Sequence, residues 1–429
     1  MARFAHFGDA HIGAWRDQKL KEMNMQSFTK ALDECVAAKV DFIIIAGDLF
    51  DTTLPDLALV QRTVEKIKEV KDKGIKFYLT YGSHDFAANS ISIIDILNSA
   101  GLFTKVVVPE VVDEKIRLKF ITDERTGAKI AGLSGRKLGL EKTYFEMLDT
   151  AELEREDGFK IFVFHNAIIE VRSASATYAE GVPLSCFPKG FDYYAGGHVH
   201  ESLKHSIKDY GIITFPGCLF GATFTDLEIT AKGEKRGFFL VDFEDKITSV
   251  RFVEVKISDV FFQEIDATKK TVNQLSEILQ KIVNSVDVKG KIALLKVDGE
   301  LLTGKPSDIN FNQARQVLYD RGATVANINH YSLSTAEKLA SGQTKGESRQ
   351  EIENKIIFDM VSSFKIDPSL KESLQKKLRK ALSGEVGISL ATNLLNALRA
   401  EQNEGETKRD FEGRVLRDTL HLLNLEDQQ

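Results

Sequence analysis

Five apolar runs in the first 200 residues each end in a cluster that contains aspartate or histidine. A strand that stops and immediately presents such side chains supplies them at its carboxyl end, which is where open α/β sheets bind their ligands. Five strand ends of one sheet could therefore converge on a single point. The runs are RFAHFGDAH (3–11), FIIIAGDLFD (42–51), FYLTYGSHD (77–85), FKIFVFHN (159–166) and YYAGGHVH (193–200).

The side chains at these strand ends combine imidazole nitrogens with carboxylate oxygens and include no thiolate. That donor set suits two divalent metals, such as manganese, iron or zinc, better than a soft ion bound by thiolates. The sequence therefore predicts a metal site with a mixed nitrogen and oxygen environment. The residues expected around it are Asp9, His11, Asp48, His84, His165, His198 and His200.

The spacing of two residue pairs supports a shared site. Asp9 and His11 lie two positions apart, so in an extended segment both side chains would point to the same side and reach one ion. His198 and His200 repeat this spacing directly after two glycines, which favours a metal site over an unremarkable surface pair. A lone Asp-x-His motif, in contrast, is a purely structural feature about half of the time.

Single members of the set also have ordinary structural explanations. Asp48 follows Ala-Gly at the end of a strongly apolar strand, where a turn or helix-capping aspartate is common. His165 ends another apolar run, and alone it would more often be a core histidine with satisfied hydrogen bonds than a metal ligand. The metal-site hypothesis therefore depends on the joint pattern.

Composition limits the class of protein. Cys35, Cys186 and Cys218 are far apart and form no CxxC, which argues against a thiolate zinc site or a disulfide framework and favours a reducing cytoplasm. No apolar run reaches the length of about 18 residues that a membrane span needs, and a chain that opens on a strand and a motif is not expected to carry a signal peptide. The net charge of −6 argues only weakly against nucleic acid, because phosphate binding depends on local Lys and Arg.

At 429 residues the chain is too long for one ordinary core. Its first part alternates between strand and helix patterns, which predicts an α/β fold with parallel strands. Strand-rich pieces that include 236–243 and 247–255 predict a second, more antiparallel sheet. The expected divisions are a first domain at 1–255, a small α/β unit at 256–333, a linker at 334–350 and short amphipathic helices over 351–429.

The joint pattern resembles the calcineurin-like metallophosphoesterase superfamily. The five motifs of that family occur here in the family order: GD-x-H, then GDLFD for GD-x-x-(D), GSHD for G-N-H-(D/E), a strand-end histidine, and GHVH for GH-x-H. The resemblance implies an α/β (α+β) fold, in which two sheets form a sandwich flanked by helices.

Within that superfamily the chain is most similar to the archaeal-type Mre-eleven (meiotic recombination eleven) double-strand-break repair nucleases. The opening AHFGDAHIG, the AGDLFD segment and the helix-forming SIIDIL after the third motif carry this narrower resemblance. The small α/β unit stands where those nucleases have a DNA-capping domain, and the helical C-terminal region stands where they bind a partner ATPase.

The resemblance also implies roles for the site residues, with two Mn²⁺ as cofactors and Mg²⁺, Fe²⁺ or Zn²⁺ as alternatives. Asp48 would bridge the two ions, which together would clamp a phosphodiester, activate water and stabilise the leaving oxygen. His84 would contact the scissile phosphate and help to protonate that oxygen. Asp51 and Asp85 would either orient ligand histidines or be turn residues. One ion would be held by Asp9, His11, Asp48 and His200, and the other by Asp48, Ser83, His165 and His198.

Ser83 departs from the family pattern, which places asparagine at this position. Asparagine offers a carbonyl oxygen, whereas serine offers a shorter neutral hydroxyl, which hard cations also accept but which can require a bridging water to reach a metal. Our hypothesis is that the second ion is bound more weakly here.

The implied partners are DNA, a second copy of the chain and a Rad-fifty-type (SMC-like) coiled-coil ATPase. The homodimer would form through helices near 56–72 and 91–97, although their apolar residues could equally pack on the sheet. The segment KESLQKKLRKALSG (371–384) would dock on the ATPase through its leucines, or it is an ordinary helix with a solvated basic face. The candidate DNA contacts are Arg16, Lys19, Arg136 and Lys137.

The function implied by the resemblance is that of a manganese-dependent DNA exonuclease and endonuclease subunit. It would cleave phosphodiesters at DNA ends in a double-strand-break repair complex, in the cytoplasm and associated with the nucleoid. One alternative is a small-substrate metallophosphoesterase, such as a cyclic phosphodiesterase or a phosphatase, which would not require the long C-terminal extension. The other is a non-catalytic scaffold for DNA or the ATPase, which the retention of His84 and the other ligands disfavours.

Overall fold

The computed structural model describes residues 1–85, 91–135, 141–171, 181–335, 384–400 and 408–422. The chain forms two compact units, Met1–Ser334 and Thr335–Gln429. The first unit contains two six-stranded sheets and a smaller third sheet. The finer division of the chain at residues 255, 333 and 350 stays a prediction.

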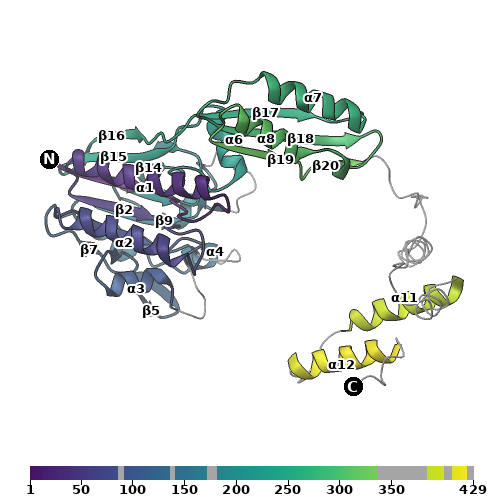
Figure 1. The fold of residues 1–429 in the computed structure, drawn as a ribbon. Helices are drawn as coiled ribbons and strands as arrows, with labels where there is room; N and C mark the ends of the chain where they lie inside the picture. Colours follow the sequence, from purple (N-terminus) through teal and green to yellow (C-terminus); the bar gives the residue numbers. More distant parts are fainter. Residues whose placement is uncertain (86–90, 136–140, 172–180, 336–383, 401–407, 423–429) are drawn as a thin grey trace. The chain divides into compact units, whose positions relative to one another are not determined.

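The first sheet has the strand order β16-β15-β1-β2-β3-β4 (Figure 1). Strands β1 to β4 run parallel, and β15 and β16 add an antiparallel edge next to β1. The prediction that 236–243 and 247–255 belong to a second sheet is therefore wrong, because these strands complete the first one. The bounds are β1 Ala2–Phe7, β2 Phe42–Ala46, β3 Lys76–Thr80, β4 Thr104–Lys105, β15 Gly237–Phe243 and β16 Ile247–Glu254.

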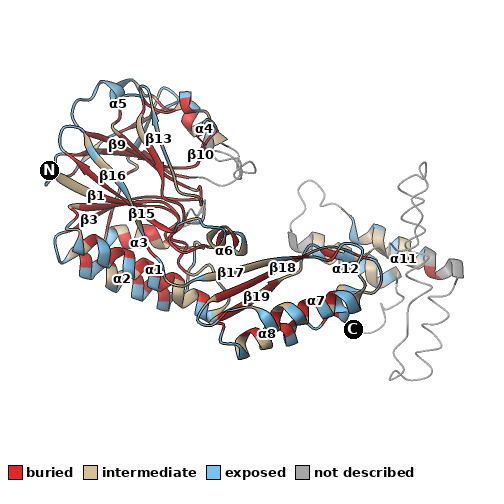
Figure 2. Cartoon of the chain, turned by 90° about the horizontal axis from the view of Figure 1, so that it is seen from above, coloured by how far each residue is buried: buried red, intermediate tan, exposed pale blue. Residues whose placement is uncertain are grey.

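Three helices cover the outer face of the first sheet, as Figure 2 shows. Each begins at a polar residue whose side chain accepts hydrogen bonds from the first turn: Asp17, Asp56 and Ser92. Their apolar residues form one core with alternate residues of the strands beneath, such as Ile43 and Ile45. The helices are α1 Gln18–Ala37, α2 Leu57–Lys71 and α3 Ile93–Ser99.

The second sheet has the order β13-β14-β12-β9-β8-β7. Its four central strands run parallel and only its two edge strands are antiparallel, as many antiparallel pairs as in the first sheet, so the expectation of a more antiparallel second sheet is also wrong. The bounds are β7 Ile121–Thr122, β8 Lys129–Leu133, β9 Lys160–His165, β12 Tyr193–Gly197, β13 Leu203–Ile207 and β14 Gly211–Phe215.

A dry apolar layer joins the two sheets. Phe4, Phe42 and Ile44 from the first sheet and Ile161 and Tyr193 from the second are fully buried in this layer. Because β2 packs against this layer on one side and against helices on the other, all five of its residues are buried. The predicted sandwich of two sheets flanked by helices is confirmed.

The third sheet belongs to the small α/β unit. Strands β17, β18 and β19 run parallel, and α7 and α8 lie together on one side of them (Figure 2). The opposite side packs against α1 and α6 through a second apolar cluster that includes Leu20, Leu227 and Leu294. The bounds are β17 Val260–Asp266, α7 Val272–Ser285, β18 Ile292–Leu301, α8 Phe311–Asp320, β19 Val325–Asn329 and β20 Leu333–Thr335.

Shorter elements complete the first unit, and two helices are described in the second. In the second unit these are α11 Gly384–Leu398 and α12 Lys408–Leu422, while 371–383 of the predicted ATPase-docking segment lie outside the described residues. Among the described helices, none has the length and apolar character needed to cross a bilayer. The shorter elements are β5 Pro109–Val112, β6 Lys115–Leu118, α4 Glu141–Glu146, α5 Ala151–Arg155, β10 Ala167–Ile168, β11 Gly181–Val182, η2 Leu184–Cys186, α6 Phe224–Ala231 and η3 Pro306–Asp308.

Two adjacent leucines of β18, Leu294 and Leu295, allow the contributions of the two apolar clusters of the small α/β unit to be tested separately. Leu294 faces α1 and α6, whereas Leu295 faces α7 and α8, and both are fully buried. We expect Leu294→Ala and Leu295→Ala each to lower the free energy of unfolding by about 2–5 kcal/mol. Hydrogen exchange should then show lost protection in α6 for Leu294→Ala, and in α7 and α8 for Leu295→Ala. The same exchange pattern in both variants would contradict this assignment of the two faces.

Candidate metal centre

The predicted ligands converge at one edge of the sandwich, but they come from two sheets rather than one. Asp9, Asp48 and Ser83 follow β1, β2 and β3 of the first sheet, whereas His165 ends β9 and His198 follows β12 in the second. Because both sheets present the carboxyl ends of parallel strands at this edge, the side chains meet between them. Their ligand atoms form three overlapping groups within 4.8 Å: Asp9, His11 and His200; Asp9, Asp48 and His165; and His11, Asp48 and His84.

Asp48 lies at the centre of the cluster. Its Oδ2 is 3.1 Å from His165 Nε2 and 3.6 Å from His11 Nε2. Its Oδ1 accepts a hydrogen bond of 2.8 Å from the backbone N–H of His84. The His11 and His200 Nε2 atoms are 3.2 Å apart. Two imidazole nitrogens and a carboxylate oxygen this close together can share a cation.

Four of the candidate residues have backbone φ angles in the left-handed region, at 47° for Asp9, 43° for His11, 49° for Asp48 and 80° for His198. The premise that Asp9 and His11 face one side of an extended segment is therefore wrong, although both reach the site. Each such conformation costs on the order of 1–3 kcal/mol and persists only where the surroundings enforce it. Here backbone hydrogen bonds from Asp9 to Gly47 and from His11 to Asp48, at 3.3 and 2.9 Å, fix the two turns against each other.

Three histidines direct one ring nitrogen into the cluster and bond the other to protein. His165 Nδ1–H donates to the Ala46 carbonyl at 2.7 Å, His11 Nδ1 contacts Asp51 Oδ1 at 3.1 Å, and His200 Nδ1 contacts Asp226 Oδ1 at 3.0 Å. Metal-binding histidines are normally held in this way, because the outer bond fixes the tautomer and leaves a lone pair for the ion. The buried Nε2 of His165 makes no hydrogen bond of good geometry with any described residue. The donor set therefore fits divalent cations.

Asp51 and Asp85 occupy different positions around the cluster. Asp51 lies beside His11, where it can orient the ring. The buried carboxylate of Asp85 instead accepts hydrogen bonds from the backbone N–H groups of Gly82 at 3.1 Å and Phe50 at 3.3 Å. Asp85 therefore connects the loops after β2 and β3 through backbone hydrogen bonds. Its contacts fit the role of a turn residue, which was one of the two roles expected for it, rather than that of orienting a ligand histidine.

Ser83 and His84 lie at the solvent side of the centre. The Ser83 hydroxyl donates to Asp48 Oδ2 over a long distance of 3.5 Å. His84 Nδ1–H donates to the Asp51 carbonyl at 2.6 Å, and the side chain is 45% exposed, in contrast to the buried rings of His11 and His165. His84 thus has an anchored ring at the point where a substrate could approach.

The negative charges of the cluster alter the titration of its histidines. Burial alone would lower the pKa of His165, but the charges of Asp48 and Asp9 raise it to about 10. Burial also opposes the rise of the His11 pKa, which Asp51 and Asp48 lift to about 9. Burial and the charge of His165 lower the pKa of His198 to about 4. The carboxylates of the centre therefore favour positive charge among these rings, and a divalent cation would supply such charge.

The sequence patterns did not reveal Asp226, whose carboxylate contacts both His200 and the first turn of α6. Its carboxylate meets His200 Nδ1 and also accepts from the backbone and hydroxyl of Thr223, at 2.9 Å each, as the capping box of α6. The charge of His200 and its hydrogen bond to Asp226 overcome burial and lower the pKa of that carboxyl. The Thr-x-x-Asp pattern at 223–226 identifies a helix start, but nothing local in the sequence connects it to His200.

The predicted DNA contacts have different surroundings. Arg16 is exposed. Lys19 donates to the Thr324 carbonyl at 3.0 Å and lies 5.2 Å from the centroid of the Tyr319 ring, so it links α1 to the small α/β unit. Arg136 and Lys137 lie outside the described residues.

Comparison with known proteins agrees with the geometry. Residues 2–202 match the family model of the calcineurin-like phosphoesterases. The DNA double-strand break repair protein Mre11 of Methanopyrus kandleri is 28% identical over 266 residues, which cover 60% of this chain but only 57% of that protein. The Mre11 of Sulfolobus acidocaldarius is 23% identical over 401 residues, which cover 89% of this chain and 98% of that protein. The uncharacterized metallophosphoesterase YhaO of Bacillus subtilis is 25% identical over 66% of this chain and 65% of its own length.

These matches confirm the resemblance predicted from the motifs, both to the metallophosphoesterases and to the archaeal repair proteins. Residues 2–202, just under half of the chain, are therefore similar to the calcineurin-like phosphoesterases, and the ligand groups at their strand ends are suited to divalent cations. The identity of the metal and of the substrate requires a separate argument.

Gly47 and Gly74 have similar φ angles but different surroundings, so alanine substitutions at the two positions distinguish steric crowding at the candidate metal centre from backbone strain. Gly47 has φ +88° and Gly74 has φ +84°, but an added Cβ would lie 2.4 Å from His165 Nδ1 at position 47 and within 4 Å of nothing at position 74. We expect Gly47→Ala and Gly74→Ala each to lose about 1–2 kcal/mol of stability through left-handed strain. Gly47→Ala should in addition displace His165 and weaken Mn²⁺ binding.

Urea unfolding and Mn²⁺ titration of both variants measure the two effects separately. The steric explanation is wrong if Gly47→Ala binds Mn²⁺ like the unaltered protein, or if Gly74→Ala weakens binding to the same extent.

Proposed function

We propose that this chain, which resembles the archaeal Mre11 repair proteins, is a manganese-dependent DNA nuclease that cleaves phosphodiesters at DNA ends exonucleolytically and endonucleolytically. The observation that carries the proposal is the central carboxylate of Asp48, which lies between His11 and His165 with His84 exposed beside it. A phosphodiesterase needs this combination of a metal-binding interior and a proton donor at the solvent side.

The ligand groups support a pair of ions that share Asp48. Asp9, His11 and His200 form one group, and Asp48 Oδ2 lies 3.6 Å from His11 Nε2 and 3.1 Å from His165 Nε2, so this carboxylate reaches a proposed ligand of each ion. Divalent ions supply Lewis acidity, which polarises a phosphate and lowers the pKa of water. One ion would be held by Asp9, His11, Asp48 and His200, and the other by Asp48, Ser83, His165 and His198, with manganese as the proposed metal and magnesium, iron or zinc as alternatives.

The protein's own groups orient these ligands and handle the proton. The Ala46 carbonyl and the Asp51 and Asp226 carboxylates fix three of the imidazole rings. With Nδ1–H held on the Asp51 carbonyl, the imidazolium form of His84 would present its Nε2–H to a phosphate and transfer that proton to the leaving oxygen, which leaves a neutral ring. His84 is thus proposed as the catalytic acid and not as a ligand.

The proposed assembly consists of DNA, a second copy of the chain and a Rad-fifty-type coiled-coil ATPase. In support of a homodimer, the apolar side chains of Leu54, Leu57, Ile91 and Ile96, within or next to α2 and α3, are 86%, 76%, 73% and 54% exposed and so are available for an interface. The ATPase contact is proposed for the C-terminal helices, and a repair nuclease of this kind would act in the cytoplasm, associated with the nucleoid.

Replacement of His84 tests the catalytic role. We expect His84→Ala to lower Mn²⁺-dependent cleavage of labelled single-stranded DNA by about 10²–10⁴-fold, because the leaving oxygen loses its acid, while Mn²⁺ binding is retained. His205→Ala, which alters a histidine within β13, serves as the matched control and should cleave normally.

The same assay distinguishes the alternatives when bis-p-nitrophenyl phosphate is tested beside DNA. Hydrolysis of the small ester alone indicates a small-substrate metallophosphoesterase. The absence of cleavage of either substrate by the unaltered protein with Mn²⁺ indicates a scaffold for DNA or the ATPase. Cleavage of DNA by His84→Ala at the normal rate would show that the assigned role is wrong.

Ser83 provides a second test, because its hydroxyl reaches Asp48 only at 3.5 Å. We expect Ser83→Asn to bind the second Mn²⁺ more tightly, since the amide carbonyl is a longer and better directed oxygen ligand. Calorimetric titration of the two proteins with Mn²⁺ measures both affinities. Equal occupancy and affinity for both ions would refute the idea that Ser83 weakens the second site.

A further inference from the structure

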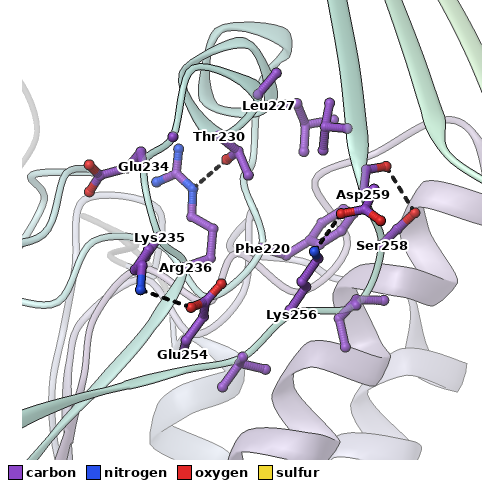
Figure 3. Close-up of a pocket in the computed structure, with 15 residues that line it drawn as sticks. Phe220, Leu227, Thr230, Glu234, Lys235, Arg236, Glu254, Lys256, Ser258 and Asp259 are labelled. Carbon is purple, nitrogen blue, oxygen red and sulfur yellow. Dashed lines mark hydrogen bonds and ion pairs between the residues drawn. The ribbon is translucent and has the colours of Figure 1, made fainter.

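Arg236 is a buried cation next to the candidate metal centre that the assignments above leave unexplained. It is 5% exposed and immediately precedes β15. Because β15 runs antiparallel to β1, this position lies at the same edge of the sheet as the carboxyl end of β1, close to Asp9. Figure 3 shows the Arg236 side chain beside Thr230 in a pocket between α6 and the chain that leads to the small α/β unit.

The guanidinium uses its three nitrogens to bond four groups, one of which is the Cys218 sulfur at 3.2 Å from Nη1. Nη1 donates to the His200 carbonyl at 2.5 Å, Nη2 donates to the Asp226 carbonyl at 2.6 Å, and Nε donates to Thr230 Oγ1 at 2.7 Å. Thr230 in turn donates its hydroxyl hydrogen to the same Asp226 carbonyl at 2.8 Å. One rigid group therefore binds the backbone of both residues of the His200–Asp226 pair.

This arrangement holds His200 and Asp226 together through their side chains and through their main chains. The side chains of His200 and Asp226 meet at 3.0 Å, and Arg236 sets the separation of their main chains. A planar fork with several donors can do this, whereas a lysine ammonium is a single point of charge on a flexible stem. The position of His200 Nε2 relative to His11 therefore depends on the planar geometry of the Arg236 guanidinium and not only on its positive charge.

The charge has a secondary effect, because it lies close enough to Asp226 to help lower the pKa of that carboxyl. A buried guanidinium is in general weak evidence for stability, since its desolvation offsets much of what its contacts contribute. Here its hydrogen bonds go to two carbonyls, a hydroxyl and the Cys218 sulfur rather than to a carboxylate partner, which favours a role in positioning.

We propose that Arg236 is a positioning residue for the metal centre, which holds His200 and Asp226 in register so that His200 can bind its ion. This role rests on the proposed function, in which His200 is a metal ligand. Arg236 itself touches neither metal nor substrate.

Arg236→Lys removes the planar guanidinium and retains the positive charge. The matched control is Arg3→Lys, because Arg3 also bonds a backbone carbonyl, that of Ala38, and lies near the start of β1 at the opposite end of the same sheet. The probe is Mn²⁺ alone, titrated calorimetrically, with urea unfolding of the metal-free proteins in parallel. In Arg236→Lys we expect one of the two Mn²⁺ sites to weaken by on the order of 10–100-fold and the other to be unchanged.

Arg3→Lys should lose stability without a change in Mn²⁺ binding. If Arg236→Lys does not fold, Thr230→Val removes the acceptor of Arg236 Nε together with the hydroxyl donor to the Asp226 carbonyl and leaves Arg236 itself in place, and Thr230→Ser restores the hydroxyl. We expect weaker Mn²⁺ binding at one site in the valine variant and normal binding in the serine variant.

The proposal is overturned if the folded Arg236→Lys or Thr230→Val protein binds both ions normally, if Arg3→Lys weakens binding equally, or if the unaltered protein binds no Mn²⁺. Cleavage of DNA is a separate readout. A protein that binds two ions with the expected dependence on Arg236 but cleaves no DNA would contradict the proposed nuclease function and leave the positioning role intact.

Discussion

The apolar layer between the two large sheets is the interaction on which the site depends. Candidate ligands come from both sheets, so no cluster exists until the sheets pack face to face. Phe4 and Tyr193 meet edge to face across the layer at 5.2 Å, and each large side chain buried there contributes about 1.5–3 kcal/mol. This packing places the carboxyl ends of β1, β2 and β3 opposite those of β9 and β12. The core of the domain therefore also sets the geometry of the metal centre.

Close approach of the sheets at this edge has a steric requirement. A Cβ at position 197 would lie 2.0 Å from the Ala46 carbonyl oxygen, so only glycine permits β12 to pass β2 there. The same carbonyl accepts the His165 hydrogen bond, which joins the sheets at the centre. Left-handed backbone at Asp9, His11, Asp48 and His198 adds strain that the surrounding packing must hold in place. The packing of the two sheets thus fixes the positions of the candidate ligand atoms.

Helix α6 connects three parts of the first unit. Its first turn contains Asp226, which contacts His200, and Leu227 packs into the cluster shared with the third sheet. Arg236 then binds the backbone of this helix and of the His200 loop. The surroundings of His200 therefore depend on contacts among segments that are distant in the sequence, and the small α/β unit rests against the same helix.

The sequence by itself determined the strands that end in the five motifs, the candidate ligand types and the resemblance to a metallophosphoesterase, because periodicity and motif spacing are local properties. It did not determine that 236–243 and 247–255 join the first sheet, that Asp9 and His11 are left-handed, or that Lys19 bonds Thr324. These features, together with the Asp226–His200 contact, arise from pairing and hydrogen bonding between distant segments. Only the tertiary structure decided them, because local sequence patterns do not specify which distant groups meet once the sheets and helices pack.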